Sequence, residues 1–268
     1  MDNRPIGIFD SGLGGLTGMK ALLELLPEEN IVYFADSGRN PYGSRTREQV
    51  RCMAEQNLRF ISSFGVKAIL VACGTVSSNA SDLLEQWPVP TAGVLQPAAD
   101  YIGRLPGAVP VAVAATAASI QSGSYQKALQ DHCPGREIVA AACPDFVPLI
   151  ESGHCSADDP LVQDAVARCL RPVKEAGAGV LLLGCTHYGL ISTAVSAFLG
   201  PDVQLVSASE CGAAALCGRL LRTRSTGGSR QWRFFTSGST DAFNEAAARI
   251  LGADRQIAAE YVPPLPYQ

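Results

Sequence analysis

The chain has 268 residues, of which 47% are hydrophobic and 17% charged, and its formal net charge is −4. These values are typical of a globular protein with a well-packed core and argue against a disordered chain. No basic run is present that would bind nucleic acid, and no apolar run approaches the roughly 18 residues that a membrane span needs. We therefore expect neither nucleic acid nor membrane as a partner.

Cysteine and histidine usage limits the classes of site further. The nine cysteines are an odd number without a Cys-x-x-Cys pair, and no basic-then-apolar leader precedes them. Reduced thiols in a cytoplasmic protein are the expectation. Because His132, His154 and His187 are far apart in sequence, no local metal motif is formed and we expect no metal site.

The first part of the chain alternates short apolar runs with segments of helical periodicity. The glycine-rich stretch 11–16 follows the first run and reads as a turn into a helix. We predict strands at 6–10, 31–35, 67–72 and 91–95, and helices at about 17–26, 46–64 and 78–86.

A second cycle then repeats the order strand, polar turn, helix, strand, loop, long helix, strand and cysteine. We predict strands at 110–115, 138–141 and 180–184, a turn at 116–123, helices at 125–130 and 161–176, and a short helix or loop at 146–153. The tail adds a helix near 213–222, a polar break at 224–230, a strand at 233–236 and a helix at 241–251.

This repetition predicts an α/β fold of two similar open parallel-sheet lobes related by pseudo-twofold symmetry, with the active site in the cleft between them. The tail has 60 residues, too few for a third well-cored domain, so we expect it to complete the first lobe. The predicted lobes are residues 1–97 with 208–268, and residues 98–207.

Two cysteines occupy equivalent places in the two cycles. Cys73 follows the apolar run 69–72, and Cys185 follows the run 181–184. Ligands of open α/β sheets bind at the carboxyl ends of strands, so each thiol is expected at the edge of a site. Backbone N–H groups at a helix start favour an anion, and we therefore expect lowered thiol pKa values. Two thiols on either side of one pocket have the geometry of a proton shuttle.

Other side chains near these turns can move protons or bind a ligand. Asp10 ends the first strand and His187 lies two residues after Cys185, so each is a candidate acid or base. Glu151 by itself reads as a solvated helix charge. Hydroxyls at the strand-end turns can cap helices or hold a ligand, and with no arginine in these turns a carboxylate would be held by neutral donors and helix dipoles. These hydroxyls are Ser11, Thr75, Thr116, Ser119 and Thr186.

A dinucleotide fingerprint is nearly present. Gly12, Gly14 and Gly18 follow a strand, and Asp36 ends the next one. The third glycine of the fingerprint belongs at position 17, which is a threonine, and a nucleotide fold would leave the second Cys-Thr turn unexplained. We therefore regard dinucleotide binding as less well supported by the sequence than a site between the two Cys-Thr turns.

Five motifs in order resemble the glutamate racemases of the cofactor-independent aspartate/glutamate racemase family. They are IFDSGLGGL at 8–16, DS at 36–37 with PYG at 41–43, ACGT at 72–75, SGSY at 122–125 and GCTHY at 184–188. The resemblance covers residues 6–207. It implies an isomerase without a cofactor that interconverts L- and D-glutamate, supplies D-glutamate for peptidoglycan in the cytoplasm, and is often a homodimer.

The resemblance also implies roles for individual residues. Cys73 matches the thiol that acts on the D-enantiomer, with Asp10 as the acid beside it. Cys185 matches the thiol that acts on the L-enantiomer, with His187 beside it, and Glu151 matches the family's assisting glutamate. The positions that match substrate contacts are Ser11, Tyr42, Gly43, Gly74, Thr75, Thr116, Ser119 and Thr186.

Three positions depart from the family pattern. Gly74 stands where asparagine is usual, Gln96 where glutamate is common, and Ser119 where threonine is usual. An amide at position 74 would donate a hydrogen bond worth about 1.5–3 kcal/mol to a charged substrate, so Gly74→Asn is expected to raise the affinity for glutamate.

Three alternatives stay open at this point. Gly74 leaves room for aspartate or another amino acid as the substrate. A non-catalytic amino-acid-binding relative would be stabilised by its ligand without turnover. A cysteine hydrolase could use Cys185 and His187, but it would leave Cys73 without a role.

Overall fold

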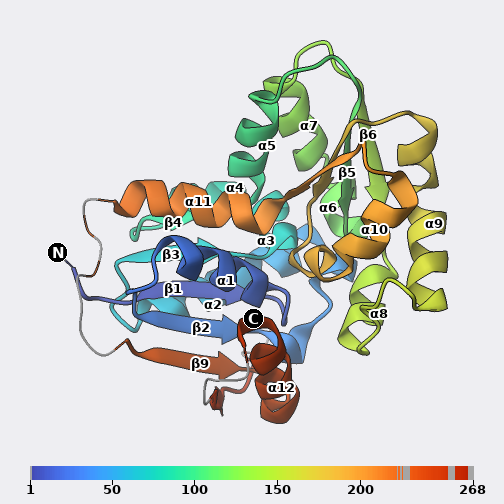
Figure 1. Ribbon diagram of the computed structural model, residues 1–268. Helices are drawn as coiled ribbons and strands as arrows, with labels where there is room; N and C mark the ends of the chain where they lie inside the picture. The colour runs from blue at the N-terminus through green and yellow to red at the C-terminus, as the bar shows by residue number, and fades with distance from the viewer. Residues whose placement is uncertain (1, 222, 224, 226–229, 253–256, 265–268) are drawn as a thin grey trace.

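Figure 1 shows the computed structural model, which describes residues 2–221, 223, 225, 230–252 and 257–264. The described strands form two sheets, and every strand pair is parallel. The first sheet has the order β10 (Ala259–Tyr261), β9 (Trp232–Thr236), β2 (Ile31–Ala35), β1 (Ile6–Asp10), β3 (Ala68–Val71) and β4 (Thr91–Ala92). The second has the order β6 (Ile138–Ala142), β5 (Val111–Ala115), β7 (Val180–Leu183) and β8 (Gln204–Ser207).

The two sheets share one strand order. The segment β2-β1-β3-β4 of the first sheet corresponds strand by strand to β6-β5-β7-β8 of the second. The predicted class, two similar open parallel α/β lobes, is therefore confirmed. The tail strand β9 pairs with β2, and β10 pairs with β9, so both belong to the first sheet. The exact lobe boundaries at 97/98 and 207/208 stay a prediction.

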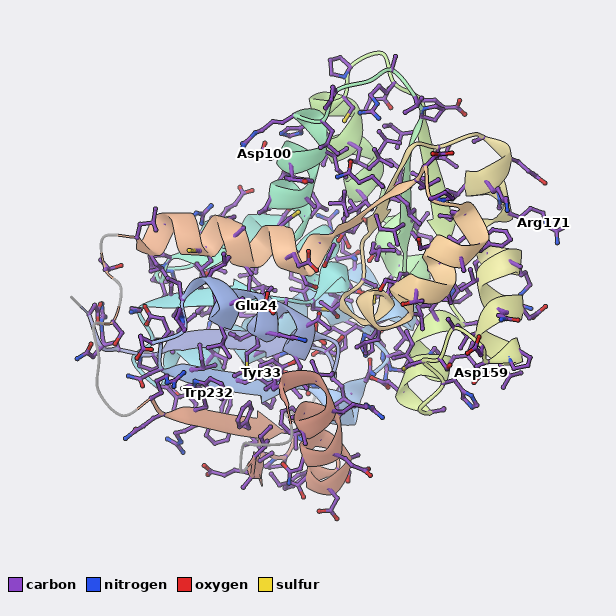
Figure 2. The ribbon with its side chains drawn as sticks, viewed as in Figure 1. Glu24, Tyr33, Asp100, Asp159, Arg171 and Trp232 are labelled. Carbon is purple, nitrogen blue, oxygen red and sulfur yellow. The ribbon has the colours of Figure 1, made fainter. Side chains whose placement is uncertain are left out.

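Helices cover both faces of the first sheet, and this is why its inner strands read as continuous apolar runs. Alternate residues of each strand contact opposite helix layers; Tyr33, labelled in Figure 2, packs against Phe234 and Phe243, whereas Phe34 packs against Phe60 on the other face. One layer contains α1 (Gly15–Leu25), α11 (Ala208–Leu220) and α12 (Thr240–Leu251); the other contains α2 (Arg47–Ser62), α3 (Gly74–Asn79) and α4 (Ser81–Glu85).

The second sheet is enclosed in the same way. One layer contains α5 (Leu95–Gly103) and α7 (Ser124–His132), with α6 (Ala117–Gln121) beside them. The other contains α8 (Phe146–Glu151), α9 (Pro160–Glu175), the 3-10 segment η3 (Thr186–Ile191) and α10 (Ser192–Leu199). Figure 1 shows this green and yellow lobe beside the blue first lobe, with α11 lying across the first lobe.

Several predicted elements differ from the structure. The predicted strand 91–95 stops at Ala92, and Leu95 begins a helix, α5, because Pro97 falls in a first turn, where no N–H is required. The predicted turn 116–123 contains α6, which Thr116 caps through the N–H of Ser119. The predicted helix 78–86 is two helices that meet at Ala80. The sequence patterns did not predict η3, α10, β8 and β10. Most of the polar break at 224–230 lies outside the described residues.

A buried ion pair and its neighbouring hydrogen bonds hold four distant segments of the first lobe together. Lys67 Nζ lies 2.6 Å from Glu29 Oε2, and both side chains are 2% exposed. The same ammonium group donates to the carbonyl oxygens of Asp2 and Thr223. The charge of Lys67 is thus fully partnered although it is removed from water.

Candidate functional site

A cavity of about 140 Å³ lies between the lobes where β1, β3 and β7 end. This volume suits a small metabolite better than a drug-sized ligand. Most of the residues predicted for the site line it. They are Ser11, Tyr42, Gly43, Cys73, Gly74, Thr75, Thr116, Cys185, Thr186 and His187.

The two thiols reach this one cavity from equivalent strands. Cys73 directly precedes α3 after β3, and Cys185 directly precedes η3 after β7. These strands hold the same place in the shared order, each next to the first strand of its sheet. Both sulfur-bearing residues are buried, at 3% and 8% exposure, and face each other's lobe across the cavity that they both line.

The expectation of a lowered thiol pKa does not hold at Cys73. Burial, reinforced by the negative charge of Asp10, raises the pKa of the Cys73 thiol to about 12, and the hydrogen bond with Ser11 offsets only part of this effect. The thiol donates to Ser11 Oγ at 3.4 Å. At this buried position the cost of desolvating an anion exceeds the attraction of a six-residue helix. Cys73 is therefore a protonated thiol at neutral pH, the state of a proton donor.

On the opposite side, a chain of contacts links Cys185 to a carboxylate. Cys185 Sγ lies 3.8 Å from His187 Nδ1, and His187 Nε2 lies 3.0 Å from Glu151 Oε1. Burial alone would lower the pKa of His187, but the hydrogen bonds with Cys185 and Glu151 raise it well above its ordinary value. His187 Nδ1 is thus placed to exchange a proton with the neighbouring sulfur.

Glu151→Gln is expected to lower the pKa of His187, because it removes the carboxylate that stabilises the imidazolium. Since the raised pKa stabilises the folded protein below the unfolded histidine pKa and this stabilisation is lost as pH rises through the folded value, the variant also loses part of its stability at low pH. NMR titration of the imidazole measures the shift. Glu175→Gln, on an exposed part of α9, is the control; an unchanged His187 pKa in Glu151→Gln would contradict the assignment.

Asp10 lies behind the cavity lining and connects the lobes. It is fully buried, its Oδ1 accepts the Gly12 N–H at 2.9 Å, and its Oδ2 accepts the Thr186 hydroxyl at 3.2 Å. Burial raises the pKa of Asp10, although the charge of His187 and these hydrogen bonds oppose the shift. A carboxylate with a raised pKa is a better proton acceptor for a thiol.

Three of the predicted hydroxyls form direct hydrogen bonds between the lobes together with two that were not predicted, Ser78 and Ser124. Thr75 Oγ1 lies 3.1 Å from Thr116 Oγ1, and Ser78 donates to Ser119 at 3.1 Å. Ser124 donates to the Ser78 carbonyl at 2.6 Å. Thr75 and Thr116 also line the cavity, whereas the structure places Ser119 behind it. We call Thr75, Ser78, Thr116, Ser119 and Ser124 the hydroxyl seam.

Ser119→Ala is expected to lower the free energy of unfolding by about 1–3 kcal/mol while leaving the KM for substrate nearly unchanged. The Ser119 hydroxyl is fully buried and bonds both Thr116 and Ser78, so its removal leaves polar partners without a contact. Urea unfolding and steady-state kinetics measure the two effects. A large increase in KM with unchanged stability would instead place Ser119 against the substrate.

The other predicted residues have definite places as well. The Tyr42 hydroxyl donates to Asp36, so this hydroxyl is engaged although the residue lines the cavity. Asp36 also binds Arg39 and Ser237, and it is therefore not free to hold a ribose, as the dinucleotide interpretation requires. Gly43 packs so closely on Thr116 that a Cβ there would lie 2.7 Å from the Thr116 Cβ.

The sequence did not point to several residues of the site. Asn40 lines the cavity and donates to Glu151 Oε1 at 2.5 Å, bridging the lobes at the cavity. Val147 and Pro148 line it from α8. A signal for these two existed, because they precede Glu151 by four and three residues and therefore share its helix face. Asn40 carried a weaker signal, its position directly before the PYG motif.

The charge of the lining is unusual for an anion site. None of the described residues that line the cavity is lysine or arginine, so a carboxylate would meet hydroxyls, N–H groups and the His187 imidazole. This agrees with the predicted use of neutral donors. Across the described part of the chain, no cluster of three or more His, Cys, Asp or Glu is placed to hold a metal ion. No described helix is long and apolar enough to cross a membrane, and all nine cysteines are free thiols.

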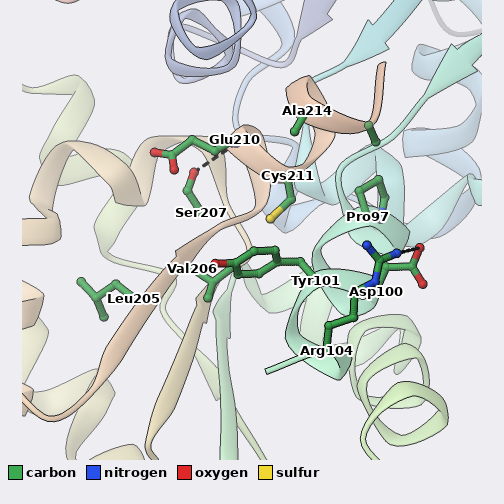
Figure 3. Close-up of a pocket in the computed structure, with 11 residues that line it drawn as sticks. Pro97, Asp100, Tyr101, Arg104, Leu205, Val206, Ser207, Glu210, Cys211 and Ala214 are labelled. Atoms are coloured by element: carbon green, nitrogen blue, oxygen red, sulfur yellow. Dashed lines mark hydrogen bonds and ion pairs between the residues drawn. The ribbon is translucent and has the colours of Figure 1, made fainter. Parts of the chain in front are cut away.

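A larger pocket of about 460 Å³ lies elsewhere, between α5 and the β8–α11 junction. Figure 3 shows Tyr101 and Arg104 on one side and Ser207, Glu210 and Cys211 on the other. Arg104 pairs with Asp100, and Ser207 caps α11. This pocket has no facing pair of nucleophiles or bases. The smaller cavity, on which thiols, imidazole and hydroxyls converge, is therefore the candidate site.

Comparisons with known proteins agree on one family. The model of the Asp/Glu/Hydantoin racemase family matches residues 15–216. The glutamate racemase of Thermoanaerobacter pseudethanolicus is 35% identical over 257 residues, which cover 94% of this chain and 95% of that protein. The structure of glutamate racemase isoform RacE1 from Bacillus anthracis has a TM-score of 0.91 and 32% identity, with 98% of each chain covered. The Francisella tularensis glutamate racemase in complex with D-glutamate has a TM-score of 0.88 and 32% identity, also with 98% of each chain covered.

Proposed function

Because the chain belongs to the Asp/Glu/Hydantoin racemase family of isomerases, we propose that it interconverts L- and D-glutamate by two-base proton transfer. The observation that carries this proposal is that Cys73 and Cys185, from different lobes, line one small cavity. Enantiomers have equal free energy, so a catalyst must serve both directions. Two chemically similar acid–base groups on opposite faces of the α-carbon meet that requirement.

One starting state is the simplest for the reaction. Cys73 is protonated, and Cys185 lies beside His187, whose raised pKa suits it to carry a proton. From L-glutamate, the Cys185 thiolate takes the α-proton, so that the C–H bond breaks and an S–H bond forms. The Cys73 thiol then gives its proton to the other face, which forms D-glutamate and leaves a Cys73 thiolate. The reverse reaction exchanges the two roles.

Each thiol has its own partner for resetting its protonation. Asp10 affects Cys73 through its charge, and its raised pKa suits it to hold a proton. His187 and Glu151 do the same for Cys185. The carbanion between the transfers would be stabilised by the preorganised donors that line the cavity and by His187. These steps use the side chains of the chain itself.

Glutamate is the proposed substrate because the relatives with the strongest similarity are glutamate racemases, one of them with D-glutamate bound. The Cys185–His187–Glu151 chain also has the order of a cysteine hydrolase triad. That interpretation leaves Cys73 unused. The racemase interpretation uses every one of these groups.

The wider role rests on the family resemblance alone. We propose that the chain supplies D-glutamate for peptidoglycan, acts in the cytoplasm and forms a homodimer. The oligomeric state is checked by light scattering on the purified chain, and the cellular role by whether D-glutamate in the medium rescues a strain that lacks the gene.

The activity is tested by incubating purified protein with either enantiomer of glutamate and separating the products by chiral chromatography. Both reactions are expected to end at an equal mixture of the two enantiomers. L-aspartate, L-glutamine and L-alanine run in parallel resolve the specificity that Gly74 left open. Ligand-induced stabilisation with no turnover of any of them would instead favour a binding protein.

A further inference from the structure

The residue after Cys73 touches the residue before Cys185. A Cβ built on Gly74 would overlap the carbonyl oxygen of Gly184 and lie 3.0 Å from the Tyr125 hydroxyl. The backbones of the two lobes therefore meet directly beside the two thiols. Only a residue without a side chain fits between them at this separation.

The Gly184 carbonyl is held from both sides. The Gly184 N–H donates to Ala114 of β5 at 2.8 Å, and its carbonyl accepts the Tyr125 hydroxyl at 2.8 Å. Tyr125 is fully buried in the second lobe and packs with the core that includes Ala99, Val113 and Leu129. Because both of these partners belong to the second lobe, the Gly184 carbonyl has a fixed position there. It therefore limits how closely α3 can approach.

Hydrogen bonds from other residues of α3 hold this helix against the same lobe. Within the hydroxyl seam, Thr75 and Ser78 of α3 bond Thr116 and Ser119, and Ser124 bonds the Ser78 carbonyl. These hydrogen bonds hold α3 close to the second lobe, and the Gly184 carbonyl oxygen limits how closely the helix approaches that lobe. The position of Cys73, one residue before the helix, follows from this balance.

We propose that Gly74 is a positioning residue whose missing side chain seats α3 against the Gly184 carbonyl and so sets the distance between Cys73 and Cys185. The inference rests on the proposed two-thiol function. It also changes the expectation for Gly74→Asn, because an asparagine must displace α3 before its amide can bind a substrate. That variant is expected to lose activity and not to gain affinity.

Gly74→Ala tests the proposal. A methyl group here pushes Cys73 outward while Cys185, on the other lobe, stays in place. Since a misplacement of about 1 Å costs about 10²-fold in rate, racemisation is expected to fall about 30- to 100-fold. Proton removal from L-glutamate by Cys185 is expected to fall much less, so in deuterated water L-glutamate exchanges its α-proton without inversion.

The readout is the ratio of exchange in recovered L-glutamate to formation of D-glutamate. We expect this ratio to rise at least about tenfold in Gly74→Ala. Loss of folded protein lowers both rates equally and leaves the ratio unchanged. Gly218→Ala is the matched control, because a Cβ on this exposed residue of α11 meets no atom within 4 Å.

Tyr125→Phe provides an independent variant, because it removes the hydrogen bond that the Tyr125 hydroxyl donates to the Gly184 carbonyl. Loss of this hydrogen bond is expected to lower racemisation about threefold to tenfold, with the ratio shifted in the same direction. This variant decides the matter by itself if Gly74→Ala fails to fold. An unchanged ratio in the folded variants, with an active wild type, overturns the role of Gly74; a wild type that cannot racemise glutamate overturns the proposed function instead.

Discussion

Cys73→Ser and Cys185→Ser are each expected to lower kcat for glutamate racemisation by about 10³-fold in both directions. A serine hydroxyl has almost the same size as a thiol but is a far weaker acid, so it neither removes the α-proton nor returns one. Both directions suffer because each turnover needs one group as base and the other as acid. Chiral chromatography of the products with time measures the loss.

The control is Cys52→Ser, since Cys52 is a partly exposed residue of α2 that does not line the cavity. It is expected to keep the activity of the wild type. Thermal unfolding of all three variants shows whether any loss comes from the chemistry or from the fold. If either cavity variant kept more than about a tenth of the kcat, the corresponding thiol would not be an essential proton carrier.

The largest effect on stability is expected from Glu29→Gln, which removes one member of a pair that is 2% exposed on both sides. It leaves the Lys67 ammonium buried without a counter-charge, and breaking such a pair costs about 3–5 kcal/mol. The carbonyls of Asp2 and Thr223 still accept from Lys67, but they do not neutralise it. Urea unfolding followed by far-UV circular dichroism measures the free energy.

Glu55→Gln is the matched control, because the Glu55–Arg59 pair on α2 has side chains that are 42% and 70% exposed. An exposed pair of this kind contributes about 0.2–1 kcal/mol. If Glu29→Gln changed stability no more than Glu55→Gln, water or a shift of the chain end would have to compensate the Lys67 charge. The buried pair would then not hold the chain start to the end of α11.

The strands that end at the two thiols could be predicted from the sequence because buried parallel strands give an unambiguous pattern. The runs before Cys73 and Cys185 are apolar without interruption, and the strand ends fix where the next side chains lie. The helix α5 could not be predicted in the same way, because Pro97 reads as a break unless the start of the helix is already known.

Contacts between the lobes could not be derived from the pattern at all. Asn40 meets Glu151 across 111 residues of chain, and Gly74 meets Gly184 across a similar span. Such pairs depend on how two independent cores dock, and no local periodicity records this. The family resemblance supplied Glu151, but it suggested for Gly74 a role in binding where the structure shows a backbone contact.

The protonation state of Cys73 is a third property that could not be predicted from the sequence. Its place before a helix predicted a lowered thiol pKa, whereas burial and Asp10 raise it to about 12. Desolvation depends on the whole surrounding fold, and it outweighs the local helix contribution. The sequence predicted a place for Cys73 at the edge of a site, where it lies, but could not give the protonation state of its thiol.

The fate of the α-hydrogen in the first turnovers tests most directly whether two sulfurs act on opposite faces of one carbon. Wild-type protein converts a small fraction of L-glutamate in deuterated water, and mass spectrometry follows both enantiomers. Proton transfer by two bases predicts deuterium at the α-carbon of nearly all new D-glutamate, with hydrogen retained in the remaining L-glutamate. D-glutamate that carried the original hydrogen would mean that a single base moves the proton from face to face, and it would contradict the account.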